Sequence, residues 1–253
     1  MARASPVAAG ADARAVAVLQ GTSNCAGQVQ LDTSPSDDAV EACARGNVGH
    51  VWFTERAAGG VLVEARVYGY ANSARFGIHI HEAGDLSVAS GTSALGHYNP
   101  SGAAHGLPGS NDTEWHAGDL GNIGVFDATG DGAGYFRHVQ PGVTLDEYVG
   151  RAVVIHEKRD RGAGRGCDDK GNAGRRLAIG VIGIAAPAAV AEHIVGADHP
   201  DTEPFPAAID TALASFKSVP APCTRKRDDD DVDGDHAHDD AAAAAEYDYD
   251  AFE

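Results

Sequence analysis

Short stretches in which apolar and polar residues alternate recur along the chain from Ala15 onward, separated by clusters of Gly, Asn, Asp and Pro. A period of two is typical of strands that bury one face. The predicted strands are Val16–Gln20, Gln28–Leu31, Gly49–Thr54, Val61–Tyr68, Phe76–Glu82, Gly118–Phe126, Gly134–Val139, Arg151–His156 and Ala178–Ile184. No convincing helical period lies among them. Many short strands at even spacing predict an antiparallel all-β sandwich or barrel.

Two connections between these strands are unusually long and polar. They run from His97 to Ala117 and from Glu157 to Arg176, and neither has strand or helix character. Structureless connections of this length inside a compact domain are uncommon and usually functional. Something other than a hydrophobic core must therefore hold them in place.

The pattern divides the chain into four parts. We expect a flexible N-terminus over 1–13, a β domain over 14–186, an extension over 187–223 and an acidic disordered tail over 224–253. Within the extension, Ile209, Leu213 and Phe216 would share one face of a short helix over Pro206–Phe216. The tail could serve solubility or bind a partner, or its histidines could scavenge metal weakly.

The charge argues against broad classes of partner. The chain of 253 residues carries a formal net charge of −18. Half of it lies in Thr224–Glu253, where 12 acidic residues accompany 3 basic ones. A nucleic-acid or anionic-membrane binder is therefore not expected. No run of eighteen apolar residues exists to span a membrane.

The opening segment and the cysteines bear on the compartment. The opening segment lacks a secretory signal pattern, so a cytoplasmic location is expected, although its Ala-rich start leaves an organelle leader open. The cysteines are Cys25, Cys43, Cys167 and Cys223, with no CxxC pair, which argues against a zinc ribbon or a thioredoxin-type site.

The first candidate chemistry is the pair His79-Ile80-His81 at the end of an apolar strand. A period of two places both imidazoles on one face, where they could share an ion. The spacing alone is weak evidence, because His236-Ala237-His238 in the tail has it too.

A second cluster lies in and just after the long connection: His97, His105, His116 and Asp119. Three imidazoles and a carboxylate suit a four-coordinate zinc site, and a metal would also hold the connection in place. The alternative is a solvated loop with scattered polar residues. His156 ends another apolar strand, and its importance depends on whether it meets the other histidines in space.

Several motifs occur in one order: GIHIHEAGD, GHYNP, WHAGDLGNI, VVIHEKRD and GNAGRRLAIGVIGIA. Together they resemble the copper/zinc superoxide dismutase family over roughly Arg14 to Ala186. The resemblance implies an eight-stranded Greek-key β-barrel of the immunoglobulin-like sandwich type, with two long functional loops. It also implies bound copper and zinc and, as for most members, a homodimer.

The resemblance assigns roles position by position. It implies copper ligands His79, His81, His97 and His156, and zinc ligands His97, His105, His116 and Asp119, with His97 shared between the two ions. Asp160 resembles the acid that links a copper histidine to a zinc histidine. Arg176 resembles the arginine that holds the substrate anion, and His97 would also store a proton for the product.

These assignments agree with the chemistry of superoxide disproportionation to dioxygen and hydrogen peroxide. Four imidazoles suit a copper ion that alternates between two oxidation states. The Glu157–Arg176 segment holds seven Lys/Arg against four Asp/Glu and would steer a small anion inward. For Arg159, Arg161 and Arg165, plain solvation of the loop is the favoured interpretation.

The chain departs from the family at its usual disulfide, because Gly91 and Ile179 stand where cysteines are expected. Cys167 could pair with Cys25 or Cys43 instead, or the thiols could be free. Two rivals to the enzyme remain: a non-enzymatic member that handles copper or acts as a decoy, and a structural zinc-only barrel. The chain keeps every implied copper histidine and the arginine, which favours the enzyme.

Overall fold

The computed structural model describes residues 13–25, 47–68, 70, 75–108, 114–125, 134–163 and 170–186. Its strands are β1 (Arg14–Gly21), β2 (Asn47–Glu55), β3 (Val61–Val67), β4 (Arg75–His81), β5 (Asp119–Val125), β6 (Gly134–Gln140), β7 (Ala152–His156), β8 (Arg176–Val181) and β9 (Gly183–Ile184). All but one of the predicted strands coincide with these to within a few residues. The exception, Gln28–Leu31, lies outside the described residues, as do the predicted extension and tail.

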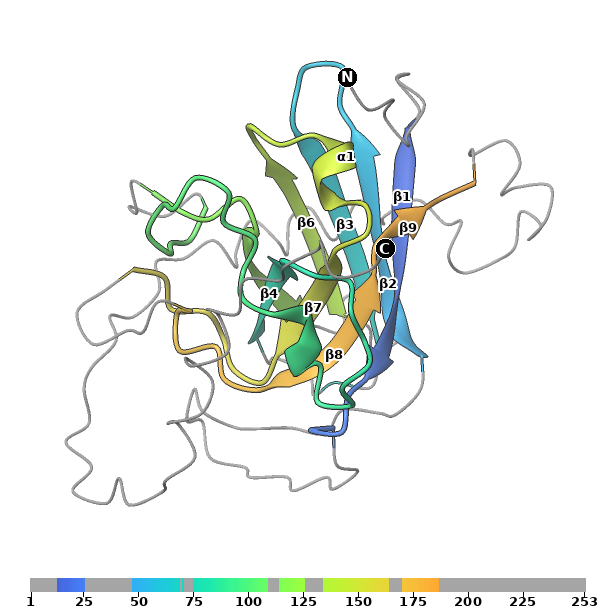
Figure 1. Cartoon of the computed structure of the whole chain (residues 1–253), viewed down its shortest axis with the longest axis vertical. Helices are drawn as coiled ribbons and strands as arrows, with labels where there is room; N and C mark the ends of the chain where they lie inside the picture. Colours follow the sequence, from blue (N-terminus) through green and yellow to red (C-terminus); the bar gives the residue numbers. More distant parts are fainter. Residues whose placement is uncertain are drawn as a thin grey trace, which may run out of the picture. The chain divides into compact units, whose positions relative to one another are not determined.

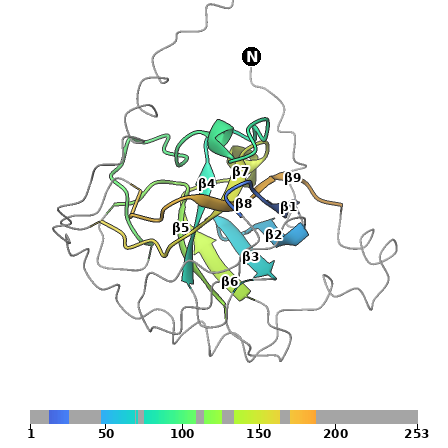
Figure 2. The ribbon, with the colours of Figure 1, turned by 90° about the horizontal axis from the view of Figure 1, so that it is seen from below.

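The described strands close into an antiparallel barrel (Figures 1 and 2). They pair in the order β2-β3-β6-β5-β4-β7-β8-β1, and a pairing of β1 with β2 completes the ring. The neighbours β3–β6 and β4–β7 are not consecutive in sequence, as in a Greek key. A break at Ile182 separates β8 from β9, which pairs with the other end of β1. The predicted eight-stranded barrel is confirmed.

Strand β4 shows how the sequence pattern positions the site. Ile78 and Ile80 point into the hydrophobic core, so His79 and His81 point to the outer face. Both histidines are nevertheless fully buried, at 0% and 1% exposure, because connecting segments cover this face. The alternating pattern therefore predicted correctly to which face of β4 these side chains point. The burial of the outer face, in contrast, depends on segments distant in sequence.

A one-turn helix, α1 (Leu145–Tyr148), was not expected from the sequence. Thr144 and Glu147 form a capping box at its start, and Leu145 and Tyr148 pack into the core. The Thr-x-x-Glu spacing is the sequence signature that could have identified this helix. A second short segment, the 3-10 helix η1 (Thr92–Ala94), lies in the connection that follows β4.

Two further findings concern the whole described part. No helix there has the length and hydropathy needed to cross a membrane. Cys25 is fully buried and disulfide-bonded, so the free-thiol alternative is wrong for this residue. Cys43, Cys167 and Cys223 lie outside the described residues.

Candidate metal centre

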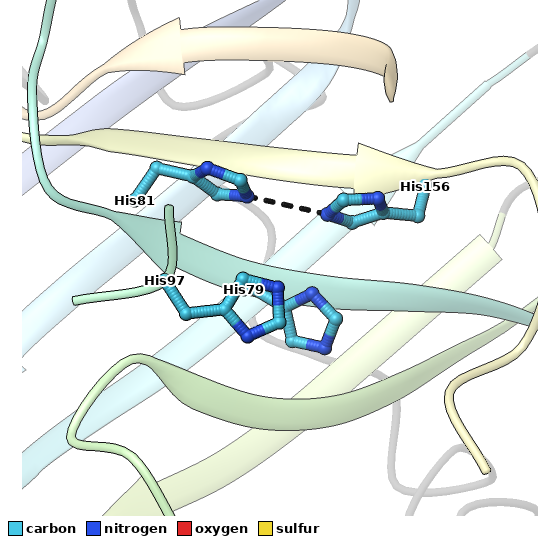
Figure 3. Close-up of side chains that lie close together, drawn as sticks. All are labelled: His79, His81, His97 and His156. Atoms are coloured by element: carbon cyan, nitrogen blue, oxygen red, sulfur yellow. Dashed lines mark hydrogen bonds between the residues drawn. The ribbon is translucent and has the colours of Figure 1, made fainter. Parts of the chain in front are cut away.

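Four buried histidines meet on the outer face of β4 (Figure 3). His79 and His81 come from β4, and His156 comes from the end of the neighbouring strand β7. His97 comes from the following connection, where an isolated bridge pairs it with His81. Each histidine offers one ring nitrogen, and these four nitrogens all lie within 4.8 Å of one another. The four side chains could therefore hold one ion.

Each of these imidazoles uses one ring nitrogen in a hydrogen bond and turns the other towards the group. His79 Nε2 bonds to Asp160 at 2.8 Å, and His97 Nδ1 bonds to Asp119 at 2.9 Å. Nδ1 of His81 donates to the Leu95 carbonyl at 2.7 Å, and Nδ1 of His156 donates to the Gly174 carbonyl at 3.0 Å.

The nitrogens left over are those a metal would use. Nδ1 of His79 and Nε2 of His97 are buried without any hydrogen-bond partner. Nε2 of His81 lies 3.2 Å from Nε2 of His156. Buried polar nitrogens are normally paired, and a bound ion would satisfy all four at once. The donor set therefore fits a metal ion.

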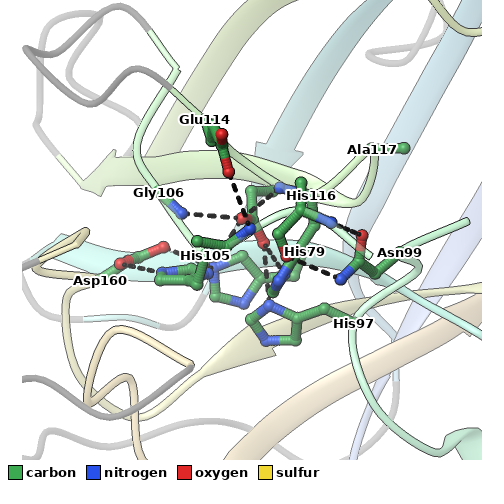
Figure 4. Close-up of polar contacts among 12 residues, drawn as sticks. His79, His97, Asn99, His105, Gly106, Glu114, His116, Ala117 and Asp160 are labelled. Carbon is green, nitrogen blue, oxygen red and sulfur yellow. Dashed lines mark hydrogen bonds and ion pairs between the residues drawn. The ribbon is translucent and has the colours of Figure 1, made fainter. Parts of the chain in front are cut away.

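The second group is centred on the buried carboxylate of Asp119. Figure 4 shows its three histidines, His97, His105 and His116, close together. Nδ1 of His97 and of His116 lie 2.9 and 3.1 Å from its Oδ1, and Nδ1 of His105 lies 2.9 Å from its Oδ2. The backbone amides of Gly106 and His116 also donate to Oδ2. Three imidazoles and one carboxylate thus converge closely enough to hold a second ion.

His97 belongs to both groups, with a different nitrogen in each. Its Nδ1 faces Asp119, and its Nε2 faces the first group. Its ring centroid lies 4.0 Å from that of His79 and 5.3 Å from that of His105. One imidazole therefore separates the two candidate ion positions.

Asp160 makes a second connection between the groups. Its Oδ2 lies 2.8 Å from His79 Nε2, and its Oδ1 lies 3.0 Å from His105 Nε2. Asn122 of β5 fixes this aspartate by exchanging two hydrogen bonds with its backbone, at 2.6 and 2.9 Å. Every candidate ligand and the linking acid predicted from the sequence thus lie together.

The environment favours the neutral form of three rings in the first group. Burial, followed by the neighbouring imidazoles, holds the pKa of His81 and His156 well below the usual value. Burial and then His79 lower the pKa of His97 to about 3. Metal ligands must be deprotonated, so His81 and His156 would lose no proton on binding an ion at neutral pH, whereas His97 would have to lose its remaining ring proton to bind an ion at each nitrogen.

The pKa of His105 is shifted in the opposite direction. Burial alone would lower its pKa, but hydrogen bonds to Asp119 and Asp160 outweigh burial and raise the pKa to about 10. The same contacts hold the pKa of both aspartates below the usual value, although burial opposes this shift. Both carboxylates are therefore ionised, and a bound cation would displace the proton that they hold on His105.

Arg176 begins β8, directly opposite His156 in the pairing with β7. Its guanidinium donates from Nη1 to the carbonyl of Gly91 and from Nη2 to the carbonyl of Leu95 at 2.6 Å. The Leu95 carbonyl also accepts from His81, so it links the arginine to the first group. Leu95 has a positive φ of 64°, unusual for a side chain of its size.

Sequence reasoning missed some contacts that shape the site. Leu95 gave no signal, because only its backbone takes part. Arg175 pairs with Glu157 through two hydrogen bonds, at 2.7 and 3.0 Å, and these lower the pKa of Glu157. The position of Glu157, directly after His156, was the available hint. Arg165 and the His236/His238 pair lie outside the described residues.

Comparisons with known proteins agree on one family. The family model for copper/zinc superoxide dismutase matches residues 47–182. A superoxide dismutase [Cu-Zn] of Talaromyces marneffei is 33% identical over 177 residues, which are 68% of this chain and 99% of the relative. Superoxide dismutase [Cu-Zn] A of Xenopus laevis is 40% identical over 143 residues, covering 54% of this chain and 89% of the relative.

A solved structure gives the same result for the fold. The crystal structure of the clock protein EA4 is similar with a TM-score of 0.51 and 32% identity, covering 73% of this chain and 100% of that one. The family uses copper and zinc, and the two side-chain groups described above are of the kind that could bind them. This chain belongs to the copper/zinc superoxide dismutase family.

Proposed function

We propose that this chain is an active superoxide dismutase, which converts two superoxide anions to dioxygen and hydrogen peroxide. His79, His81, His97 and His156 would hold copper, and His97, His105, His116 and Asp119 would hold zinc. The observation that carries the proposal is His97, which turns one nitrogen to each group. Neither a simple copper carrier nor a zinc-only barrel would need such a shared ring.

The chemistry of the two donor sets supports the assignment of ions. Four imidazoles suit copper in both of its common oxidation states. Three imidazoles with a carboxylate suit zinc, which is held by four ligands in closed sites. When bound, copper supplies one-electron oxidation and reduction, whereas zinc does not change its oxidation state.

The chain's own residues bind the substrate and move the proton. Arg176 would hold the superoxide anion through its guanidinium, which two carbonyls keep oriented beside His81. His97 can accept a proton at Nε2 and donate it to the peroxide product, while Asp119 keeps its ring in place through Nδ1. Asp160 would maintain the orientation of His79 in the same way.

The experiment loads the full-length protein with copper and zinc, measures bound metal and compares dismutation rates of wild type and Arg176→Ala. We expect both proteins to hold both metals. The variant should lose about 10- to 100-fold in kcat/KM, because a charged hydrogen-bond donor to the substrate is removed. Arg176→Lys keeps the charge but not the two-pronged set of donors, so its kcat/KM should lie between those of wild type and Arg176→Ala.

Two results would count against the proposal. Wild-type protein that holds copper but runs no faster than aqueous background would favour the copper-handling alternative. Zinc without copper would favour the structural barrel.

A further inference from the structure

The chain directly after β1 contacts the candidate anion-binding arginine. Thr22 is buried, and its hydroxyl donates to the backbone carbonyl of Arg176 at 2.6 Å. The side-chain amide of Asn24 donates to the same carbonyl at 3.1 Å. Two side chains that lie more than 150 positions earlier in the chain therefore fix the backbone of Arg176.

The same short segment also holds the loop that orients the guanidinium. The Ser23 amide donates to the Ala89 carbonyl at 2.8 Å, and the Asn24 side chain reaches the Ser90 carbonyl at 3.4 Å. The next residue of that loop, Gly91, accepts a hydrogen bond from Arg176 Nη1. Asn24 thus contacts both the backbone of the arginine and the loop that receives its side chain.

The side chain of Arg176 itself ties this loop to β8 through its hydrogen bonds to Gly91 and Leu95. Gly91 and Ile179 meet only by packing, since a Cβ added to Gly91 would lie 3.3 Å from Ile179 Cδ1. The added Cβ would also lie 3.6 Å from Thr22 Cγ2. Polar contacts from Thr22–Asn24 therefore occur where no covalent link joins Gly91 to Ile179. Cys25, directly after them, is disulfide-bonded, which restrains the end of this segment.

We infer that Thr22 and Asn24 are positioning residues, which keep the guanidinium of Arg176 oriented for the substrate anion. The inference rests on the proposed function for the identity of the substrate but not for the contacts. Loss of either side chain removes one of the two hydrogen bonds that they donate to the carbonyl of Arg176. Loss of Asn24 also removes the contact with Ser90 in the loop that carries the Gly91 and Leu95 carbonyls.

The test compares Asn24→Ala and Thr22→Val with matched controls. Thr22→Val keeps the shape of the side chain but removes the hydroxyl, whereas Thr22→Ser keeps the hydroxyl. Ser23→Ala lies between them and preserves the backbone contact to Ala89. Asn24→Ala and Thr22→Val should each lower kcat/KM by about three- to tenfold, as expected for the loss of one or two hydrogen bonds. Both controls should remain near wild type.

A double variant separates positioning from general destabilisation. If Thr22 and Asn24 act through Arg176, Asn24→Ala should add nothing to the loss already caused by Arg176→Ala. Losses that simply multiply would overturn the inference.

Two further measurements do not depend on turnover. Copper-loaded Asn24→Ala should bind azide, a small anion, about three- to tenfold more weakly, as followed by visible absorption. Its amides from Gly91 to Leu95 should exchange hydrogen faster than in Ser23→Ala. If wild type lacks dismutase activity, the proposed function fails, and these two measurements still decide the inference. Unchanged azide affinity and unchanged exchange would overturn it.

Discussion

At the scale of single residues, the arrangement of the site depends on individual atoms of His97 and Asp119. The imidazole uses Nδ1 for the carboxylate and Nε2 for the first group, so its ring cannot rotate without losing one of them. Asp119 in turn lies within 3.1 Å of three imidazole Nδ1 atoms and accepts hydrogen bonds from two backbone amides. Single substitutions here should therefore separate the two metals.

Asp119→Ala should weaken zinc binding far more than copper binding. The substitution removes the carboxylate on which three Nδ1 atoms converge, while His79, His81 and His156 keep their own hydrogen-bond partners. Metal content after dialysis against a graded series of chelator concentrations measures the effect. Equal loss of copper and zinc would contradict the assignment of Asp119 to the second ion alone.

Gly171→Ala should disturb the site without changing a ligand. An added Cβ would lie 1.9 Å from Asp160 Oδ1 and 2.6 Å from His105 Nε2, so Asp160 would have to move. We expect affinity for metal to fall about 10- to 100-fold, as when an outer partner of a metal ligand is lost.

Gly102→Ala is a matched control for this change. Gly102 has nearly the same φ, 67° against 66°, but nothing lies within 4 Å of an added Cβ. Gly102→Ala should destabilise the fold only through the backbone strain of a positive φ, and its metal affinity should stay near that of wild type. Similar losses in both variants would show that strain, not contact with Asp160, is responsible.

At the scale of elements, helix α1 joins the core to the segment that carries the second group. The Tyr148 hydroxyl donates to the Ala117 carbonyl at 2.6 Å, and Ala117 directly follows His116. The tyrosine ring packs edge-on against Phe53 of β2. One turn of helix thus anchors the end of the long connection next to a candidate ligand.

Tyr148→Phe keeps the ring in the core and removes only this hydroxyl. We expect the free energy of unfolding to fall by about 1 kcal/mol, the usual net value of a hydrogen bond. Urea unfolding of the metal-loaded protein measures the change. Tyr98→Phe, whose hydroxyl makes a longer bond of 3.4 Å to Glu147, should cost less. Equal losses would argue against a special role for the Tyr148 contact.

At the scale of the whole molecule, two exposed apolar residues lie opposite each other on the seam between β1 and β8. Val18 of β1 is 44% exposed and Val181 of β8 is 38% exposed. The β1 pairings with β8 and β9 share one register, which places Val18 opposite Val181. Exposed apolar side chains grouped in this way often form an interface, and the family is typically homodimeric.

Val18→Lys and Val181→Lys should therefore convert a dimer to a monomer in sedimentation experiments. Burying a lysine in an apolar interface is unfavourable, whereas an exposed strand face tolerates it. Val139→Lys is the control, because Val139 is 36% exposed on β6, which is not adjacent to the seam. A monomeric wild type would show that this chain departs from its relatives.

The cytoplasmic location expected from the sequence stays a prediction.

Much of the fold was predictable because strand patterning is local. Val61–Val67 alternates between buried and half-buried positions, as its sequence indicates. The candidate ligands were identified mainly through the order of their motifs, and the structure brings His79, His81, His97 and His156 together. Helix α1 was missed because one turn is too short for helical periodicity to appear, although its capping residues were visible.

The sequence by itself determined the strands and the facing of His79 and His81 to one side, which follow from local periodicity. Its family motifs and the chemistry of the side chains also indicated the candidate metal ligands. Only the tertiary structure decided which nitrogen of each ring is left for an ion, because that choice depends on partners such as Asp160, 81 positions from His79. It also decided the contacts of Thr22 and Asn24 with Arg176, since closing the barrel brings the end of β1 beside β8.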